Sequence, residues 1–131
     1  MSTAAGSIGD ATREIRALDA EFERLANARS VDALVEAFYA EDAHLLPPHA
    51  PRVNGKAALR DFWKNFFAAI NPSDVKLQTD EISSSGDLAY GVGKYSFTAS
   101  GSQQTGKYVV VYRRERNGGY KAVVDSFSPD S

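Results

Sequence analysis

The chain has 131 residues and a net charge of -2, and 43% of its residues are hydrophobic and 24% charged. This length and composition are typical of a single globular domain that buries its own core. The charge offers no attraction to phosphate backbones, which argues against a nucleic-acid partner, and no apolar run is long enough to cross a bilayer. Because the sequence contains no cysteine, disulfides, thiolate catalysis and zinc–thiolate sites are excluded.

The first ten residues are small and polar and have neither the basic nor the apolar region of a secretory signal. We therefore expect a flexible tail over residues 1–10, followed by one domain over residues 11–131. The lack of cysteine fits a reducing compartment, and we expect the protein to be cytoplasmic.

Three helices are predicted in the first half of the chain. Apolar residues at steps of three and four predict the first helix over 11–28 and the second over 31–38. Ser30 precedes the second helix and is predicted to be its N-cap, with its hydroxyl accepting a hydrogen bond from a free amide. The third begins near Lys56 and ends before Pro72, because proline disfavours helical geometry in the preceding residue.

Strand patterns dominate the second half of the chain. A short strand is predicted over 43–46 and a loop over 51–55, and four longer strands follow, over 75–82, 88–99, 107–115 and 120–127. Helices first and strands second predict an α+β fold rather than alternating β-α-β units.

The last two strands are predicted to form a hairpin. Asn117-Gly118 suits a two-residue type I′ turn, in which both central residues have positive φ. Counting outward from this turn, we predict the pairs Tyr108–Phe127, Val110–Asp125 and Tyr112–Val123. Side chains alternate across a strand, so these six would share one face. Gly119 would shift this register if it lengthened the loop.

Asp125 is the one carboxylate on this otherwise apolar and aromatic face. Burial disfavours the charged form of a carboxylate and raises its pKa, which suits proton transfer. The alternative is that Asp125 only hydrogen-bonds a tyrosine or an amide and orients the last strand.

An aromatic cluster on the third helix either belongs to the core or lines a cavity for an apolar ligand. Together with aromatic and apolar residues elsewhere, it makes up the predicted ligand-binding set: Phe22, Tyr39, His44, Phe62, Trp63, Phe66, Tyr108, Val110, Val123 and Phe127. His44 would either shuttle protons or pack as an ordinary strand residue. Its spacing from His49 does not suit a metal site, and we expect no metal.

Both faces of the strand over 88–99 are apolar. Leu88, Tyr90 and Val92 share one face, and the alternate residues, which include Gly91 and Gly93, share the other. A sheet that is covered by helices on one side and apolar on the other predicts a second covering partner. We therefore expect a homodimer that pairs through the sheet.

The segments "AFYAEDAHLLPP" and "NGKAALRDFW", followed by four strands ending in "NGGYKAVVDSFSPD", resemble the nuclear transport factor 2-like superfamily. Within it, the chain is similar to the SnoaL-like and ketosteroid-isomerase-like small proteins. The resemblance implies a cystatin-like α+β barrel, with a curved antiparallel sheet forming a cone against about three N-terminal helices. It also implies a deep pocket, a homodimer through the sheet and no cofactor.

The sequence departs from ketosteroid isomerases at the residues that their chemistry uses. Their base lies late in the first strand, where this chain has Pro47. Their oxyanion hole uses a tyrosine and a protonated aspartate, and the matching positions here are Phe22 and Tyr112. Of these, only Tyr112 has a hydroxyl.

Two functions follow from these observations. The first is an isomerase or cyclase that acts on a small apolar carbonyl compound, in which Asp125 exchanges a proton and Tyr112 donates to the developing oxyanion. The second is a non-catalytic module for ligand binding or dimerisation, which the proline at the base position favours. One fold hosts many functions, so the resemblance alone does not decide between them.

Overall fold

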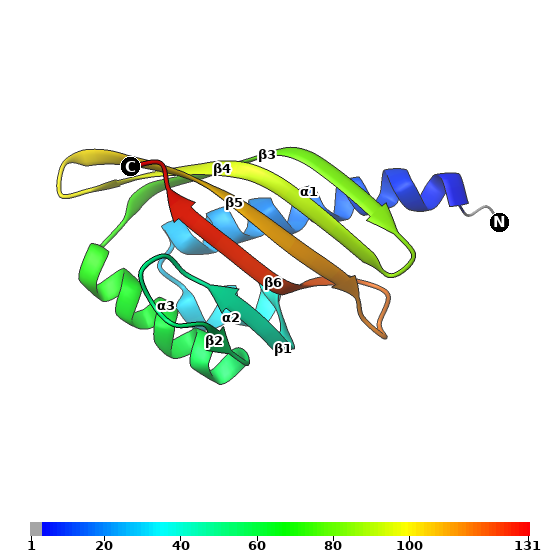
Figure 1. The fold of residues 1–131 in the computed structure, drawn as a ribbon, viewed down its shortest axis with the longest axis horizontal. Helices are drawn as coiled ribbons and strands as arrows, with labels where there is room; N and C mark the ends of the chain where they lie inside the picture. The colour runs from blue at the N-terminus through cyan, green and yellow to red at the C-terminus, as the bar shows by residue number, and fades with distance from the viewer. Residues whose placement is uncertain (1–3) are drawn as a thin grey trace.

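The computed structural model describes the backbone of residues 4–131 and the side chains of residues 11–131. Three helices pack on a curved, open sheet of six strands (Figure 1). The helices are α1 (Ala4–Asn27), α2 (Val31–Phe38) and α3 (Lys56–Ile70). The strands are β1 (Tyr39–Leu46), β2 (Val53–Asn54), β3 (Ser73–Ser85), β4 (Leu88–Ala99), β5 (Ser102–Arg114) and β6 (Tyr120–Pro129). The predicted α+β class is confirmed.

The strand order is β2-β1-β6-β5-β4-β3. The long strands β3 to β6 follow one another as antiparallel neighbours, as predicted, but β1 pairs with β6 in parallel, so the sheet is mixed. Parallel pairing needs a long crossover, and here the chain runs through α3 and four strands, β2 to β5, between β1 and β6. In the described part of the chain, no helix is long and apolar enough to span a membrane.

The helices differ from the sequence prediction mainly at the start of α1. α1 begins at Ala4, ahead of the predicted residue 11, and the first three residues of the predicted tail lie outside the described residues. Ser30 occupies the N-cap position of α2, but its hydroxyl makes no capping bond, so that part of the prediction is wrong. Its backbone carbonyl accepts from the amide of Leu34 instead. α3 ends as predicted, at Asn71 in the left-handed conformation.

Strand β1 is longer than predicted and starts directly after α2. Its end pairs with β2, which forms inside the segment predicted as a loop, with His44 opposite Asn54. A hydrogen bond from the amide of Gly55 to the carbonyl of Ala43 extends this contact. These pairings form because the chain returns to β1 after Pro47 and Pro48. Local strand propensity cannot predict such a return.

The β5–β6 hairpin has two of the three predicted pairs, Tyr108 with Phe127 and Val110 with Asp125. The third prediction is wrong, because Tyr112 lies opposite Ala122. The turn is one residue longer than a type I′ turn, with Glu115 and Gly119 hydrogen-bonded across it. A β-bulge then leaves Val123 without a partner and restores the predicted register at Asp125.

The sheet edge at β3 is covered by polar side chains of α1. Asn27 bonds both the amide and the carbonyl of Val75, Glu23 accepts from the amide of Leu77, and Arg16 donates to the carbonyl of Thr79. An exposed edge would offer these backbone groups to another strand. The helix thus holds β3 in place and brings its own inner face, which includes Asp19, against the sheet.

Candidate functional site

A cavity of about 80 Å³ lies between the helices and the inner face of the sheet. Its walls come from all three helices and from β3 to β6. The residues lining it are Asp19, Phe22, Ala26, Phe38, Trp63, Phe66, Phe67, Pro72, Val75, Leu77, Tyr95, Phe97, Tyr108, Val110, Asp125 and Phe127. Most of them are aromatic or aliphatic, and the two carboxylates among them are the polar exceptions that can act as acids or bases.

The aromatic rings of the wall pack against one another. Trp63 stacks on Phe127 with ring centroids 5.7 Å apart, and Phe22 meets the Trp63 ring edge-on at 6.0 Å. Phe66 contacts Phe127 at 6.4 Å. Such contacts hold the rings in place and leave a rigid apolar surface for a flat or aliphatic molecule.

Asp125 is 6% exposed and lies on the inner face of β6, as predicted. The hydroxyl of Tyr39 donates to its Oδ2 atom over 2.5 Å. Within the described part of the chain, its Oδ1 atom makes no hydrogen bond, although every fully buried side-chain nitrogen or oxygen there has a partner. Since Asp125 lines the cavity, we infer that Oδ1 is the oxygen that faces it.

Burial raises the pKa of Asp125 to about 6, against a smaller lowering effect of the Tyr39 hydrogen bond. The negative charge of Asp19 raises it further. A carboxylate with a pKa near 6 is largely ionised at neutral pH and close enough to it to accept and return a proton. The chemistry available at this position is therefore general acid–base transfer.

Tyr39 is fully buried behind Asp125 and does not line the cavity. Its hydroxyl accepts a hydrogen bond from the indole nitrogen of Trp63 over 3.2 Å while it donates to Asp125. Burial raises the pKa of Tyr39 well above its usual range, so it stays a neutral donor. Trp63 and Tyr39 together hold Asp125 in one orientation.

A second buried carboxylate, Asp19 of α1, was not predicted. Tyr112 donates to its Oδ1 atom over 2.7 Å, and Oδ2 is bonded to the hydroxyl of Thr79. The Thr79 hydroxyl is also 2.7 Å from that of Tyr108. Burial raises the pKa of Asp19, and its hydrogen bonds with Thr79 and Tyr112 and the charge of Arg16 oppose this rise.

The sequence did carry a signal for Asp19. It lies four residues after Ile15 and three before Phe22, which places it on the apolar stripe of α1. A charged residue within such a stripe is buried and needs partners. The partners come from β3 and β5 and could not be identified from the spacing in α1.

Two glycines of β4 make room for this network. Across the inner face, Gly93 lies between Thr79 of β3 and Tyr108 of β5. A Cβ atom at Gly93 would lie 2.7 Å from the Tyr108 hydroxyl and 2.2 Å from the backbone oxygen of Gln78. Gly91 similarly lies beneath the ring of Tyr112. The tyrosines can therefore cross β4 and reach polar groups on β3 and α1.

Several residues of the predicted ligand-binding set do line the cavity: Phe22, Trp63, Phe66, Tyr108, Val110 and Phe127. Phe62 does not line it and packs against Trp63 and Phe66. Val123 is the half-buried extra residue of the β6 bulge and is also outside the lining.

Tyr112 and His44 lie elsewhere than their predicted roles require. Tyr112 is completely buried, is absent from the cavity lining and has its hydroxyl committed to Asp19. His44 pairs with Val124 on the opposite, outer face of the sheet, and its Nδ1 atom is 2.8 Å from the side-chain oxygen of Asn54. Alternation along β1 sends Leu45, not His44, to the inner face.

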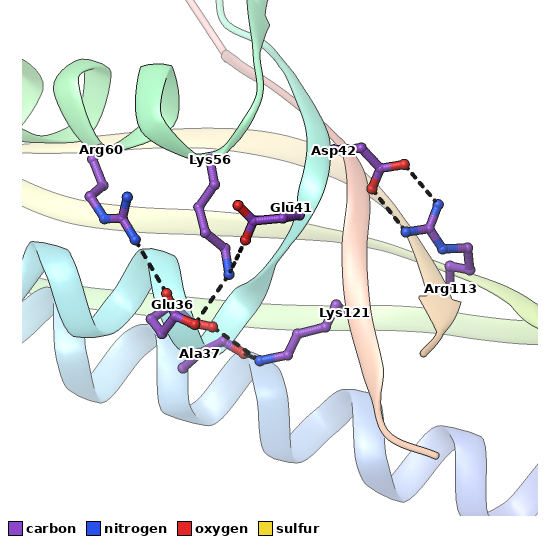
Figure 2. Close-up of polar contacts among 8 residues, drawn as sticks. All are labelled: Glu36, Ala37, Glu41, Asp42, Lys56, Arg60, Arg113 and Lys121. Atoms are coloured by element: carbon purple, nitrogen blue, oxygen red, sulfur yellow. Dashed lines mark hydrogen bonds and ion pairs between the residues drawn. The ribbon is translucent and has the colours of Figure 1, made fainter. Parts of the chain in front are cut away.

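A separate charged cluster lies outside the cavity, where α2 meets β1, α3 and β6 (Figure 2). The buried Nζ atom of Lys56 lies 3.4 Å from a Glu36 oxygen and 3.6 Å from a Glu41 oxygen. Lys121 donates to the carbonyls of Glu36 and Ala37 at the end of α2. Each cation has an acidic or carbonyl partner, so we interpret this cluster as structural. In the described residues, no group of three or more His, Asp or Glu side chains could hold a metal ion.

Solved structures with this arrangement share the fold at low sequence identity. An NTF2-like protein with a cystatin-like fold from Novosphingobium aromaticivorans is 21% identical, with a TM-score of 0.79 over 93% of this chain and 83% of that one. A ketosteroid isomerase-like protein from Erwinia carotovora atroseptica is 20% identical, with a TM-score of 0.78 over 91% and 95%. An NTF-2 like protein of unknown function from Shewanella oneidensis is 19% identical, with a TM-score of 0.78 over 89% and 98%. A comparison of the sequence with curated proteins gives no match.

The helices, the curved sheet and the cavity between them define an NTF2-like protein. Residues 19–123 match the SnoaL-like domain, and the chain belongs to that family. The expected superfamily is thereby confirmed. At these identities the structural neighbours establish the fold alone, and the activity must be argued from the residues of the site.

Proposed function

We propose that this protein binds a small apolar carbonyl compound in the cavity and moves a proton at the carbon next to the carbonyl, as an isomerase or cyclase would. Asp125 is the base. The observation that carries the proposal is the hydrogen bonding of its two oxygens: Tyr39 donates to Oδ2, whereas Oδ1 has no hydrogen bond among the described residues, and Asp125 lines an apolar cavity.

The position of Asp125 favours this chemistry for two reasons. Its pKa of about 6 allows it to be ionised before the reaction and protonated after abstraction. The wall is largely aromatic and aliphatic, so a bound apolar substrate would displace water from it and strengthen the electrostatic interaction between the carboxylate and the substrate. The abstracted proton would reside on Asp125 until it returns to the substrate at a second carbon.

Acetophenone provides a direct test, because it is flat and apolar and has exchangeable hydrogens next to its carbonyl. In D2O, we expect the protein to accelerate exchange of these hydrogens, measured by NMR, with a rate that rises as pH increases through about 6. Asp125→Asn should lower the catalysed rate by about 100-fold or more. Asp42→Asn, which removes an exposed carboxylate outside the cavity, is the matched control. Equal rates in Asp125→Asn and the unmodified protein would rule Asp125 out as the base.

The alternative function is a non-catalytic binding module, and one observation favours it. The predicted oxyanion donor, Tyr112, points to Asp19 and is not available to a ligand. Acetophenone that binds and raises the melting temperature but exchanges no hydrogens would support this alternative.

We also propose that two copies pair through the outer face of the sheet. On this face, Tyr90 lies opposite Val111 and Val92 opposite Val109, which forms a continuous apolar block over β4 and β5. Leu88 is 50% exposed, Val109 41% and Tyr90 39%, and exposed apolar patches of this kind are typical of interfaces. Sedimentation analysis should give a dimer that Val109→Lys dissociates. A monomer at all concentrations would contradict the proposal.

A further inference from the structure

Tyr108 is a further residue of the cavity wall that can form a hydrogen bond, and it was predicted only as part of the ligand-binding wall. Tyr108 lines the cavity, and its hydroxyl is bonded to Thr79, which in turn is bonded to Asp19. Tyr112 occupies the other oxygen of Asp19. Asp19, Thr79 and Tyr108 therefore form a chain of three hydrogen-bonded groups that connects α1 with the hydroxyl of Tyr108, and we name it the Asp19 relay.

The direction of the hydrogen bonds in the Asp19 relay depends on one proton. A hydroxyl donates one hydrogen bond and accepts others. If Asp19 is ionised, the Thr79 hydroxyl must donate to it, and the Tyr108 hydroxyl must then donate to Thr79. In this state Tyr108 can only accept a hydrogen bond from a ligand in the cavity. If Asp19 is protonated on Oδ2, it donates to Thr79, and Thr79 donates to Tyr108. In this state the O–H of Tyr108 is free to donate a hydrogen bond to a ligand in the cavity.

We infer that the Asp19 relay sets the polarity of Tyr108, so that with Asp19 protonated the cavity selects ligands with a carbonyl oxygen at the Tyr108 position. Tyr108 contacts the ligand, and Asp19 and Thr79 are positioning residues. The inference rests on the proposed function, because it adds the group that recognises the carbonyl of the substrate whose proton Asp125 moves. It replaces Tyr112, the donor expected from the sequence.

The surroundings of Asp19 favour the protonated form more than ordinary solvent does. Burial raises its pKa, and Thr79, Tyr112 and Arg16 oppose that rise. Asp125 on β6 lies near enough to interact with its charge. Burial also raises the pKa of Tyr108, to which the charges of Asp19, Asp125 and Asp80 contribute, so Tyr108 keeps its hydrogen. The carbonyl preference should therefore decline as pH rises through the pKa of Asp19.

Two probes of equal shape separate recognition of the carbonyl from apolar binding. Acetophenone carries a carbonyl oxygen, and α-methylstyrene has a CH₂ group in its place. In a series of calorimetric titrations from pH 4 to 9, we expect the unmodified protein at the acidic end to bind acetophenone roughly tenfold more tightly than α-methylstyrene, as one good buried hydrogen bond provides. The preference should shrink toward the alkaline end of the series, as Asp19 loses its proton.

Variants of the relay provide the decisive comparison. Tyr108→Phe and Thr79→Val should each abolish most of the preference and leave α-methylstyrene binding within about twofold, whereas Thr79→Ser keeps a hydroxyl and should retain it. Tyr112→Phe removes a donor to ionised Asp19, which raises the pKa of Asp19 and should extend the preference to higher pH. Asp125 also titrates in this pH range and could itself make binding pH-dependent. Because Asp125 is still present in Tyr108→Phe, any pH dependence of the acetophenone preference that this variant loses is due to the relay.

The outcomes distinguish this inference from the proposed function. If neither probe binds the unmodified protein, the proposed function and this inference are both wrong. If both probes bind equally at every pH, the cavity is an apolar binding site as proposed, and the inference is wrong. The inference is also wrong if the carbonyl preference is unchanged in Tyr108→Phe. If Thr79→Val does not fold, the result for Tyr108→Phe alone tests the inference.

Discussion

The hydroxyl of Tyr39 lies 2.5 Å from Oδ2 of Asp125 and joins the first residue of β1 to the inner face of β6. The two residues are 86 positions apart in sequence. Because the strands are parallel neighbours, the bond crosses the one pair of strands that the antiparallel hairpins do not connect. It holds the candidate base in place and lowers its pKa relative to burial alone.

Removing this donor should shift the titration of Asp125. In Tyr39→Phe, we expect the pKa of Asp125 to rise above about 6, because the ionised form loses a hydrogen bond and burial remains. Carboxyl ¹³C NMR over pH 4–9 measures the change. Tyr90→Phe makes the same chemical change on the outer face and should leave Asp125 unaffected. A lower or unchanged pKa in Tyr39→Phe would show that Tyr39 does not stabilise the carboxylate.

The raised pKa of Asp125 also predicts how stability depends on pH. The folded state binds a proton more tightly than the unfolded state, so the contribution of Asp125 to stability is present below pH 3.8 and lost as pH rises through about 6. At about 1.36 kcal/mol per pH unit, the whole loss is roughly 3 kcal/mol. Asp125→Asn removes the charge, so we expect it to be more stable than the unmodified protein at pH 7.5 by up to this amount and about equal at pH 4.

Urea unfolding of both proteins at a series of pH values tests this expectation. Asp19 and other carboxylates contribute to both curves, so the difference between the curves isolates Asp125. Parallel curves would mean that Asp125 has the same pKa in the folded and unfolded states. A functional group that lowers stability at neutral pH is a common feature of active sites.

Gly93 should tolerate no side chain. A Cβ atom there would lie 2.2 Å from the backbone oxygen of Gln78, which cannot rotate away. We expect Gly93→Ala to destabilise the fold by about 2 kcal/mol or more, as overpacking does. Gly91→Ala is the matched control on the same strand, since its nearest contact is the Thr79 methyl group at 3.2 Å. Thermal unfolding should show the larger loss in Gly93→Ala, and the reverse order would contradict the argument.

Lys121 should contribute to stability through the end of α2. Its Nζ atom donates to the carbonyls of Glu36 and Ala37 over 3.0 and 2.8 Å (Figure 2). These carbonyls lie in the last turn of the helix and have no intrahelical partner, so Lys121→Met should cost about 1–2 kcal/mol in urea unfolding. Lys94→Met changes an exposed lysine of β4 and should have little effect. Equal effects in the two variants would assign no capping role to Lys121.

Local patterns predicted much of this fold. Apolar spacing predicted α2 and α3 almost to the residue and placed the four long strands, because periodicities of 3.6 and 2 reflect which side of each element is buried. Alternation along the hairpin likewise placed Val110 and Asp125 together on the inner face. The bulge at Val123 and the β2 strand were missed, since both depend on pairing with distant segments.

The site shows where such patterns stop being sufficient. The sequence determined that β6 carries a lone carboxylate on an apolar face, because alternation along a strand is local. Only the tertiary structure determined which tyrosine of β5 borders the cavity. Tyr112 and Tyr108 lie on the same face of β5, yet Tyr112 is bound to Asp19, 93 residues away, while Tyr108 borders the cavity. A hydrogen-bond donor has one hydrogen, and its direction depends on whichever partner the folded chain brings within about 3 Å.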